Sequence, residues 1–283
     1  MISEKDKKDK NLYNFFEMVK VEALESILDE EIQNRYERYL WLKEMNIDPN
    51  EIHLEESHNE ILDIFDRYNQ MLNENGIEYY YTSGILSYLL VDKELERYHH
   101  DLDIFINMKD LEKLESISGL YGFSFERKLG KRNDGTNRIM LKMKYENHND
   151  IPITVFMYVR EKDGSITQND YYIGENGEHL VERMYNSKEI VDLSFSNEPK
   201  IHNDINYYAI TLEALYLSKK GNRPKDIYDC KIFEKNIDYE KLEALEEAFK
   251  YNKNNIIERA EEDTYYNFVF KDEMEKGKVL VRC

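Results

Sequence analysis

Residues 77–106, IEYYYTSGILSYLLVDKELERYHHDLDIFI, are the most informative segment of this chain about its fold. Its pattern of apolar and small residues predicts a strand, a turn at Ser83 and Gly84, a helix, and a second strand that carries Asp101 and Asp103. Because side chains alternate along a strand, the two carboxylates share one face and the apolar residues between and after them share the other. We therefore expect one face of this strand to be core and the other to be a charged site.

A charged site of this kind calls for a cation, because two carboxylates held side by side repel each other. A hard divalent ion, Mg²⁺ carrying a nucleoside triphosphate, meets that need. The turn at Ser83 and Gly84 opens a helix, where a glycine lets the backbone approach a phosphate and free N–H groups favour an anion. The spacing predicts a phosphate cradle and a metal site on adjacent strands. Taken alone, an Asp-x-Asp pair also arises by chance on solvated faces, since the chain has 58 acidic residues.

Two motifs in order resemble a known family. The first is Ser83-Gly84 followed by Arg97-x-His99-x-Asp101-Leu102-Asp103, and the second is Arg223-Pro224-Lys225-Asp226-x-x-Asp229. Together they are similar to the nucleotidyltransferase superfamily with a polymerase-β-like catalytic domain. Within it they look most like the antibiotic (lincosamide and aminoglycoside) nucleotidyltransferases and the abortive-infection toxin nucleotidyltransferases. The turn departs mildly from the Gly-Gly or Gly-Ser that is usual there.

The resemblance implies an α+β fold, in which a polymerase-β-like domain with a mixed sheet joins a helical C-terminal domain and the site lies in the cleft between them. We expect an N-terminal helical extension over residues 1–57, the catalytic domain over 58–200 and the helical C-terminal domain over 201–283. Local patterns add a helix from His58 that stops at Asn75-Gly76, a hairpin joining 136–145 to 151–159, a helix over 205–220, Pro224 in the first turn of the next helix, and Asp238 capping a helix over 239–251.

The activity that the resemblance implies is Mg²⁺-dependent transfer of a nucleoside monophosphate from a nucleoside triphosphate to an acceptor hydroxyl. In this reading Asp101 and Asp103 are catalytic residues that hold the metal. The expected nucleotide-binding residues are Ser83, Gly84, Arg97, His99, Lys219, Arg223 and Lys225. The basic cluster among them is either a triphosphate contact or a solvated face, and His99 is either a site residue or an ordinary hydrogen-bonded histidine.

A third acidic residue on a neighbouring strand completes the site in that family, or acts as general base toward the acceptor. Here the corresponding position falls on Thr154, which cannot be a carboxylate ligand. Asp150 lies on the same strand face, about 13 Å away at ~3.3 Å per residue, and Pro152 could shorten that distance by kinking the strand. Asp150 is the candidate third catalytic residue; the alternatives are a base from elsewhere, impaired catalysis, or a different register of this strand.

The formal net charge of −19 argues against broad nucleic-acid binding and favours a cationic or neutral acceptor. An antibiotic-like small molecule, and hence antibiotic resistance, is the first expectation. A toxin-type enzyme that modifies RNA or protein, and a catalytically impaired nucleotide-binding regulatory protein, stay open as alternatives. The charged N-terminus MISEKDKKDK and the lack of a long apolar run predict a cytoplasmic protein without a membrane span.

Overall fold

The computed structural model describes residues 54–82, 84–91, 99, 101–131, 136–220, 224–252 and 255–274. The predicted helices of the N-terminal extension lie outside these residues, up to residue 53. The described strands are β1 (Tyr79–Thr82), β2 (Leu102–Asn107), β3 (Phe123–Lys131), β4 (Asn137–Tyr145), β5 (His148–Arg160), β6 (Ile166–Ile173), β7 (His179–Asn186), β8 (Lys200–His202), β9 (Ile205–Tyr207) and β10 (Ile256–Arg259). The described helices are α4 (Leu54–Glu74), α5 (Leu86–Leu90), α6 (Leu111–Ser118), α7 (Lys188–Ser194), α8 (Leu212–Ser218), α9 (Pro224–Phe233), α10 (Tyr239–Lys250) and α11 (Tyr266–Val269).

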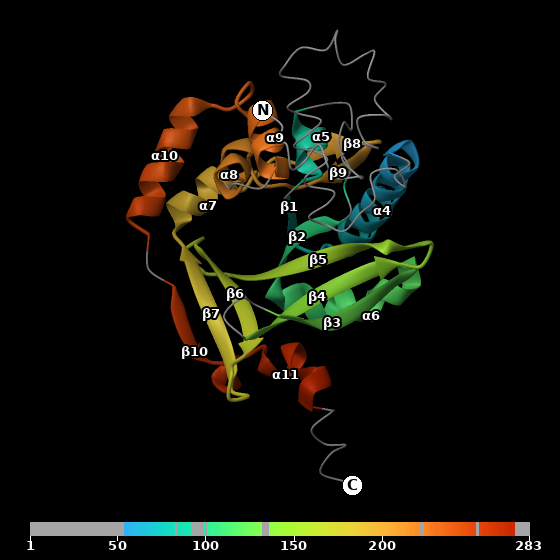
Figure 1. The fold of residues 1–283 in the computed structure, drawn as a ribbon, viewed down its shortest axis with the longest axis vertical. Coiled ribbons are helices and arrows are strands. Elements are labelled where there is room, and N and C mark those ends of the chain that lie inside the picture. The colour runs from blue at the N-terminus through green and yellow to red at the C-terminus, as the bar shows by residue number, and fades with distance from the viewer. Residues whose placement is uncertain are drawn as a thin grey trace, which may run out of the picture.

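One mixed sheet organises the described residues (Figure 1). Its strands run in the order β1-β2-β5-β4-β6-β7-β10, with β3 pairing to β4 outside this path. The pair β2 and β5 is parallel, and the other strand pairs of the sheet are antiparallel. The expected α+β fold with a mixed sheet is confirmed, as is the hairpin that joins β4 to β5.

Helices cover both faces of this sheet (Figure 1). On one face, the Tyr68 hydroxyl of α4 donates to Met143 Sδ of β4 at 3.1 Å, and Phe268 of α11 packs edge-on to Phe125 of β3. On the other face, the ring of Phe195, which follows α7, packs against Phe105 of β2. We call this second face the site face, because alternation along β2 places Asp103 on the same side as Phe105.

Several local predictions are confirmed by the helix ends. Helix α4 ends at Glu74 and is followed by Gly76 in a left-handed conformation (φ 61°), the backbone that glycine adopts most easily. Helix α9 begins at Pro224. The Asp238 side chain accepts hydrogen bonds from the first backbone N–H groups of α10, as an N-cap residue should.

The helix predicted over residues 205–220 is wrong in its first part. Residues 205–207 form β9, which pairs with β8 around a turn where Asn203 and Asp204 adopt positive φ angles. The helix α8 begins only at Leu212, after Thr211, whose side chain accepts from the Ala214 N–H. The turn and the threonine cap interrupt a pattern whose apolar spacing resembled a continuous helix.

The C-terminal region is helical from α8 to α10, and it also contributes a strand to the sheet. Strand β10 pairs with β7 and forms an edge of the sheet. Upstream, Ala209 forms a parallel bridge to Tyr81 of β1. The range predicted as a helical domain, 201–283, therefore contacts the mixed sheet at both of its edges, through Ala209 beside β1 and through β10 beside β7.

Candidate active site

The strand β2 has the two-faced character that its sequence predicts. Leu102, Ile104 and Ile106 are fully buried, whereas Asp101 and Asp103 are partly exposed. Asp101 immediately precedes the strand and Asp103 is its second residue. The carboxylates thus begin the strand on the site face, where a ligand can reach them.

A row of side chains crosses the sheet at Asp103. Its partner on β1 is Thr82, its partner on β5 is Thr154, and Thr154 in turn is opposite Lys142 of β4. Partners in register point to the same face, so these four side chains lie in line on the site face. The sequence indicated Thr154 as the position of the third carboxylate, and it failed to indicate Thr82 or Lys142.

The turn between β1 and α5 follows Thr82 directly. Ser83 lies outside the described residues. The Gly84 carbonyl accepts from the Ser87 N–H at 3.1 Å and from the Ser87 hydroxyl at 2.8 Å, so the turn is tied to the first turn of the helix. Helix α5 begins without a side-chain cap at Ile85. Gly84 thus follows Thr82 of the Asp103 row by two residues, and the phosphate cradle that we predicted at this turn stays a prediction.

The second motif reaches the same turn because α9 packs against α5 (Figure 1). Two carboxylates of this motif face Lys219 at the end of α8, whose ammonium lies 3.4 Å from Asp226 and 3.2 Å from Asp229. The three residues are 5%, 2% and 0% exposed. One buried cation facing two carboxylates ties the end of α8 to α9. The nucleotide contact that we predicted for Lys219 stays a prediction.

The structure describes the remaining predicted site residues only in part. Arg97 and Arg223 lie outside the described residues, and of Lys225 the structure describes the helical backbone only. His99 is 3% exposed, with its ring 6.5 Å from that of His58 on α4. For Asp150 too only the backbone is described: β5 runs through Pro152 without a break, and the irregularity in its pairing falls on β4, between Lys144 and Tyr145.

A cavity of about 390 Å³ opens on the site face beside the Asp103 row. Its lining combines Thr82 and Phe105 from the first strands with residues of β6, β7, α7, α8 and α10, and none of these lining residues is charged. Two lining atoms, Ser194 Oγ and Asn252 Oδ1, are buried and have no hydrogen-bond partner among the described residues. Because a buried polar atom without a partner costs free energy, such atoms indicate a site for an uncharged, hydrogen-bonding group.

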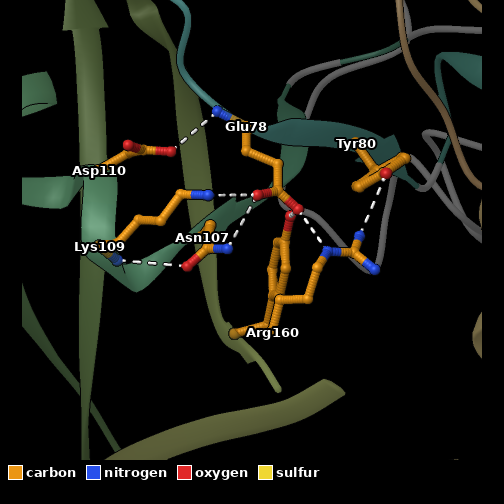
Figure 2. Close-up of polar contacts among 7 residues, drawn as sticks. Glu78, Tyr80, Asn107, Lys109, Asp110 and Arg160 are labelled. Atoms are coloured by element: carbon orange, nitrogen blue, oxygen red, sulfur yellow. Dashed lines mark hydrogen bonds and ion pairs between the residues drawn. The ribbon is translucent and has the colours of Figure 1, made fainter. Parts of the chain in front are cut away.

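A partly buried charged network surrounds Glu78, the residue immediately before β1 (Figure 2). Glu78 Oε1 accepts from Arg160 at 2.6 Å and from Tyr158 at 3.0 Å, and Oε2 accepts from Lys109 at 2.6 Å and from Asn107 at 3.0 Å. Burial by itself would raise the pKa of Glu78, but these hydrogen bonds outweigh it and lower the pKa to about 2. The network joins β1, β2 and β5, which are the three strands that carry Thr82, Asp103 and Thr154.

The donor set suits a magnesium ion that arrives with its nucleotide. Among the described residues, no group of three or more His, Cys, Asp and Glu side chains could hold a metal ion. Asp101 and Asp103 offer two carboxylates on one face, and Mg²⁺ commonly takes one or two carboxylates together with substrate phosphates and water. The residues present therefore fit Mg²⁺ bound with a triphosphate better than a site made by protein alone.

Within the described part of the chain, no helix is long and apolar enough to cross a membrane.

Comparison with known proteins gives structural neighbours only. No family model matches the chain, and no curated protein matches it. The solved structures similar to it include the lincosamide antibiotic adenylyltransferase LnuA bound to lincomycin, at 19% identity and a TM-score of 0.42 over 62% of this chain and 95% of that one. They also include the antibiotic-resistance factor ANT(2'')-Ia in solution, at 12% identity and a TM-score of 0.45 over 68% of this chain and 92% of that one.

A third similar structure is ANT(2'')-Ia in complex with adenylyl-2''-tobramycin, at 13% identity and a TM-score of 0.44 over 68% of this chain and 97% of that one. The motifs of residues 83–103 and 223–229 led to an expected resemblance to lincosamide and aminoglycoside nucleotidyltransferases. The chain is similar in structure to antibiotic nucleotidyltransferases of both kinds.

Proposed function

We propose that this protein is a Mg²⁺-dependent nucleotidyltransferase that moves a nucleoside monophosphate from a nucleoside triphosphate to a hydroxyl group of a small-molecule, antibiotic-like acceptor. The observation that carries the proposal is the strand register. It aligns Asp103 with Thr82, the residue before the turn at 83–84, and with Thr154 on the opposite side. Phosphoryl transfer needs a metal ion next to the phosphates, and an ion held by Asp103 would lie beside phosphates held at this turn.

In this proposal each part of the site has one task. Asp101 and Asp103 hold Mg²⁺, which neutralises triphosphate charge when it is bound. The turn at Gly84 binds the β- and γ-phosphates through the backbone. The cavity beside Phe105 takes the nucleoside, whose uncharged base can donate to Asn252 Oδ1 and Ser194 Oγ. The acceptor oxygen forms a bond to the α-phosphorus as the bond to pyrophosphate breaks, and the hydroxyl proton leaves to a base or to solvent.

The test is transfer of label from α-labelled triphosphates to a panel of lincosamides, aminoglycosides, glycerol 3-phosphate and tRNA, with and without Mg²⁺. We expect labelled product with at least one small-molecule acceptor, dependent on Mg²⁺ and absent in a variant with both Asp101→Asn and Asp103→Asn. Transfer to tRNA alone would replace the small-molecule acceptor by RNA. Equal label transfer by the double variant would contradict the assignment of the site.

A second candidate function is favoured by one observation, the hydroxyl of Thr154 at the position beside Asp103. If no carboxylate completes the site, the protein binds Mg²⁺ and triphosphate and transfers poorly, as a nucleotide-binding regulatory protein would. Calorimetric measurement of triphosphate binding, combined with the transfer assay, distinguishes the enzyme from the regulatory protein. Tight Mg²⁺-dependent triphosphate binding without transfer to any acceptor of the panel supports the regulatory function.

A further inference from the structure

The site face of the sheet becomes basic beyond Thr154. Along β4, Ile139, Leu141 and Met143 are buried at 3%, 0% and 0% exposure. The alternate residues, Lys142 and Lys144 among them, are partly exposed on the opposite face. Because Lys142 is opposite Thr154 in the register, both lysines share the site face with Asp103. A chain with a net charge of −19 thus presents two ammonium groups next to its candidate catalytic row.

The acidic residues nearby are paired with other cations. Glu126, opposite Lys142 on β3, is ion-paired with Lys128 at 2.9 Å. Asp170 is ion-paired with Arg138 at 2.5 Å. Among the residues that the structure describes, neither Lys142 nor Lys144 takes part in an ion pair. Both ammonium groups are partly exposed and can be reached by a ligand, and Lys144 also lies beside Lys128 on the same face.

The geometry of in-line transfer places the acceptor over β5 and β4, where Lys142 and Lys144 lie. In an in-line displacement, the acceptor oxygen enters opposite the leaving pyrophosphate. If the turn at Gly84, beyond Thr82 on β1, holds the leaving phosphates, the acceptor enters from the other side of Asp103, over β5 and β4. Lys142 is two strands from Asp103, roughly 10 Å between Cα atoms at ~4.8 Å per strand, and its four-carbon stem brings the ammonium closer.

We propose that the acceptor is a small molecule that carries a phosphate group, which Lys142 and Lys144 bind while its hydroxyl lies beside Thr154. This inference rests on the proposed function and specifies its acceptor. A cationic acceptor would be repelled by the two lysines, and a neutral one would leave their charges unused. A long nucleic acid is disfavoured because two lysines on a strongly acidic chain provide little backbone affinity.

The experiment is calorimetric titration of the full-length protein, saturated with Mg²⁺ and a non-hydrolysable triphosphate analogue so that the triphosphate cradle is filled. The probes are glycerol 3-phosphate, glycerol, and a single-stranded RNA oligonucleotide. The variants are the double changes K142E/K144E and the milder K142Q/K144Q. The control is Lys235→Glu in the exposed turn that follows α9, which alters the net charge in the same direction.

We expect glycerol 3-phosphate to bind the wild type and the Lys235→Glu control alike, and to bind both double variants at least about tenfold more weakly, since each charged hydrogen bond to phosphate is lost. Glycerol should not bind measurably. Equal titration of glycerol 3-phosphate and glycerol, or unchanged phosphate binding in both double variants, overturns the proposal. If the double substitutions weaken binding of the RNA oligonucleotide but not of glycerol 3-phosphate, the proposal is overturned in favour of a nucleic-acid acceptor.

Binding of the triphosphate analogue, measured first, separates this proposal from the proposed function. The double variants at Lys142 and Lys144 should retain analogue binding, because these residues lie on the acceptor side. A wild type that fails to bind the analogue contradicts the proposed function itself. Normal analogue binding without phosphate binding contradicts only the phosphate-bearing acceptor.

Discussion

Asp103 and Thr154 are direct partners in the parallel register of β2 and β5, and their side chains point to the same face of the sheet. In the family that the sequence motifs resemble, a carboxylate is expected where Thr154 lies. The hydroxyl can orient a substrate, but it cannot accept the proton of an attacking alcohol as a carboxylate can. Several consequences of this site can be measured.

Thr154→Asp should raise the rate of transfer if nothing replaces the missing carboxylate, because the new group lies beside Asp103. If Asp150 serves as the base, Asp150→Asn should lower the rate by about 10²-fold or more and leave Mg²⁺-triphosphate binding intact. Single-turnover assays and calorimetry on the same preparations provide both readouts. Full activity in Asp150→Asn together with no gain in Thr154→Asp would contradict both versions.

Asp101→Asn and Asp103→Asn should each remove Mg²⁺-dependent triphosphate binding while thermal unfolding stays close to that of the wild type, because both side chains are partly exposed on the site face. Titration with the triphosphate in the presence of Mg²⁺ or of a chelator measures the effect. Asp192→Asn, an exposed carboxylate on α7, is the matched control. Unchanged Mg²⁺ dependence in the variant with both substitutions would be incompatible with a metal site at this pair.

Gly84→Val should weaken triphosphate binding more than it lowers the melting temperature, since a branched side chain would occupy the space that the phosphates need. Gly84→Ala, with one added methyl group, should fall between the wild type and the valine variant. Parallel calorimetry and thermal unfolding distinguish the two effects. Equal nucleotide affinity in all three proteins would rule out a cradle at this turn.

Glu78 should make stability depend on pH in the acid range. Its pKa is lowered from an ordinary value near 4.5 to about 2, so its contribution is fully present above pH 4.5 and is lost as the pH falls toward 2. The contribution is on the order of 3 kcal/mol, which follows from ~1.4 kcal/mol for each tenfold change in the proton equilibrium. Urea unfolding at a series of pH values should show an advantage of the wild type over Glu78→Gln that shrinks below pH 4.5. Glu112→Gln, an exposed change on α6, should show no such pattern, and a constant difference for Glu78→Gln would refute this origin.

Lys219→Met should destabilise the protein by about 3–5 kcal/mol, because Asp226 and Asp229 would lose a buried countercharge. Adding Asp226→Asn and Asp229→Asn to Lys219→Met removes the unpaired charges and should recover part of the loss. Chemical unfolding of the two variants measures both effects. A Lys219→Met protein that is as stable as the wild type yet binds triphosphate weakly would assign Lys219 to the nucleotide instead.

Local features of the chain were predictable from its sequence. The alternation around Asp101 and Asp103 predicted which face of β2 is buried, and the cap at Asp238 and the stop at Asn75-Gly76 marked helix ends. Each of these depends on residues a few positions apart, whose backbone preferences and periodicity act within one element. For the same reason the prediction failed at residues 205–220, where a turn and a capping threonine separate two elements with similar apolar spacing.

Which helices and strands contact each other could not be predicted from the sequence and is seen only in the three-dimensional structure. The alignment of Thr82, Asp103, Thr154 and Lys142 requires three strand pairings between segments far apart in the chain, and a shift of one residue in any pairing would turn a side chain to the other face. The Glu78 network, the burial of Lys219 and the joining of β10 to β7 likewise depend on contacts between distant segments. Sequence spacing specifies the face on which a residue lies within its own strand, whereas the register between strands is set by how the whole core packs.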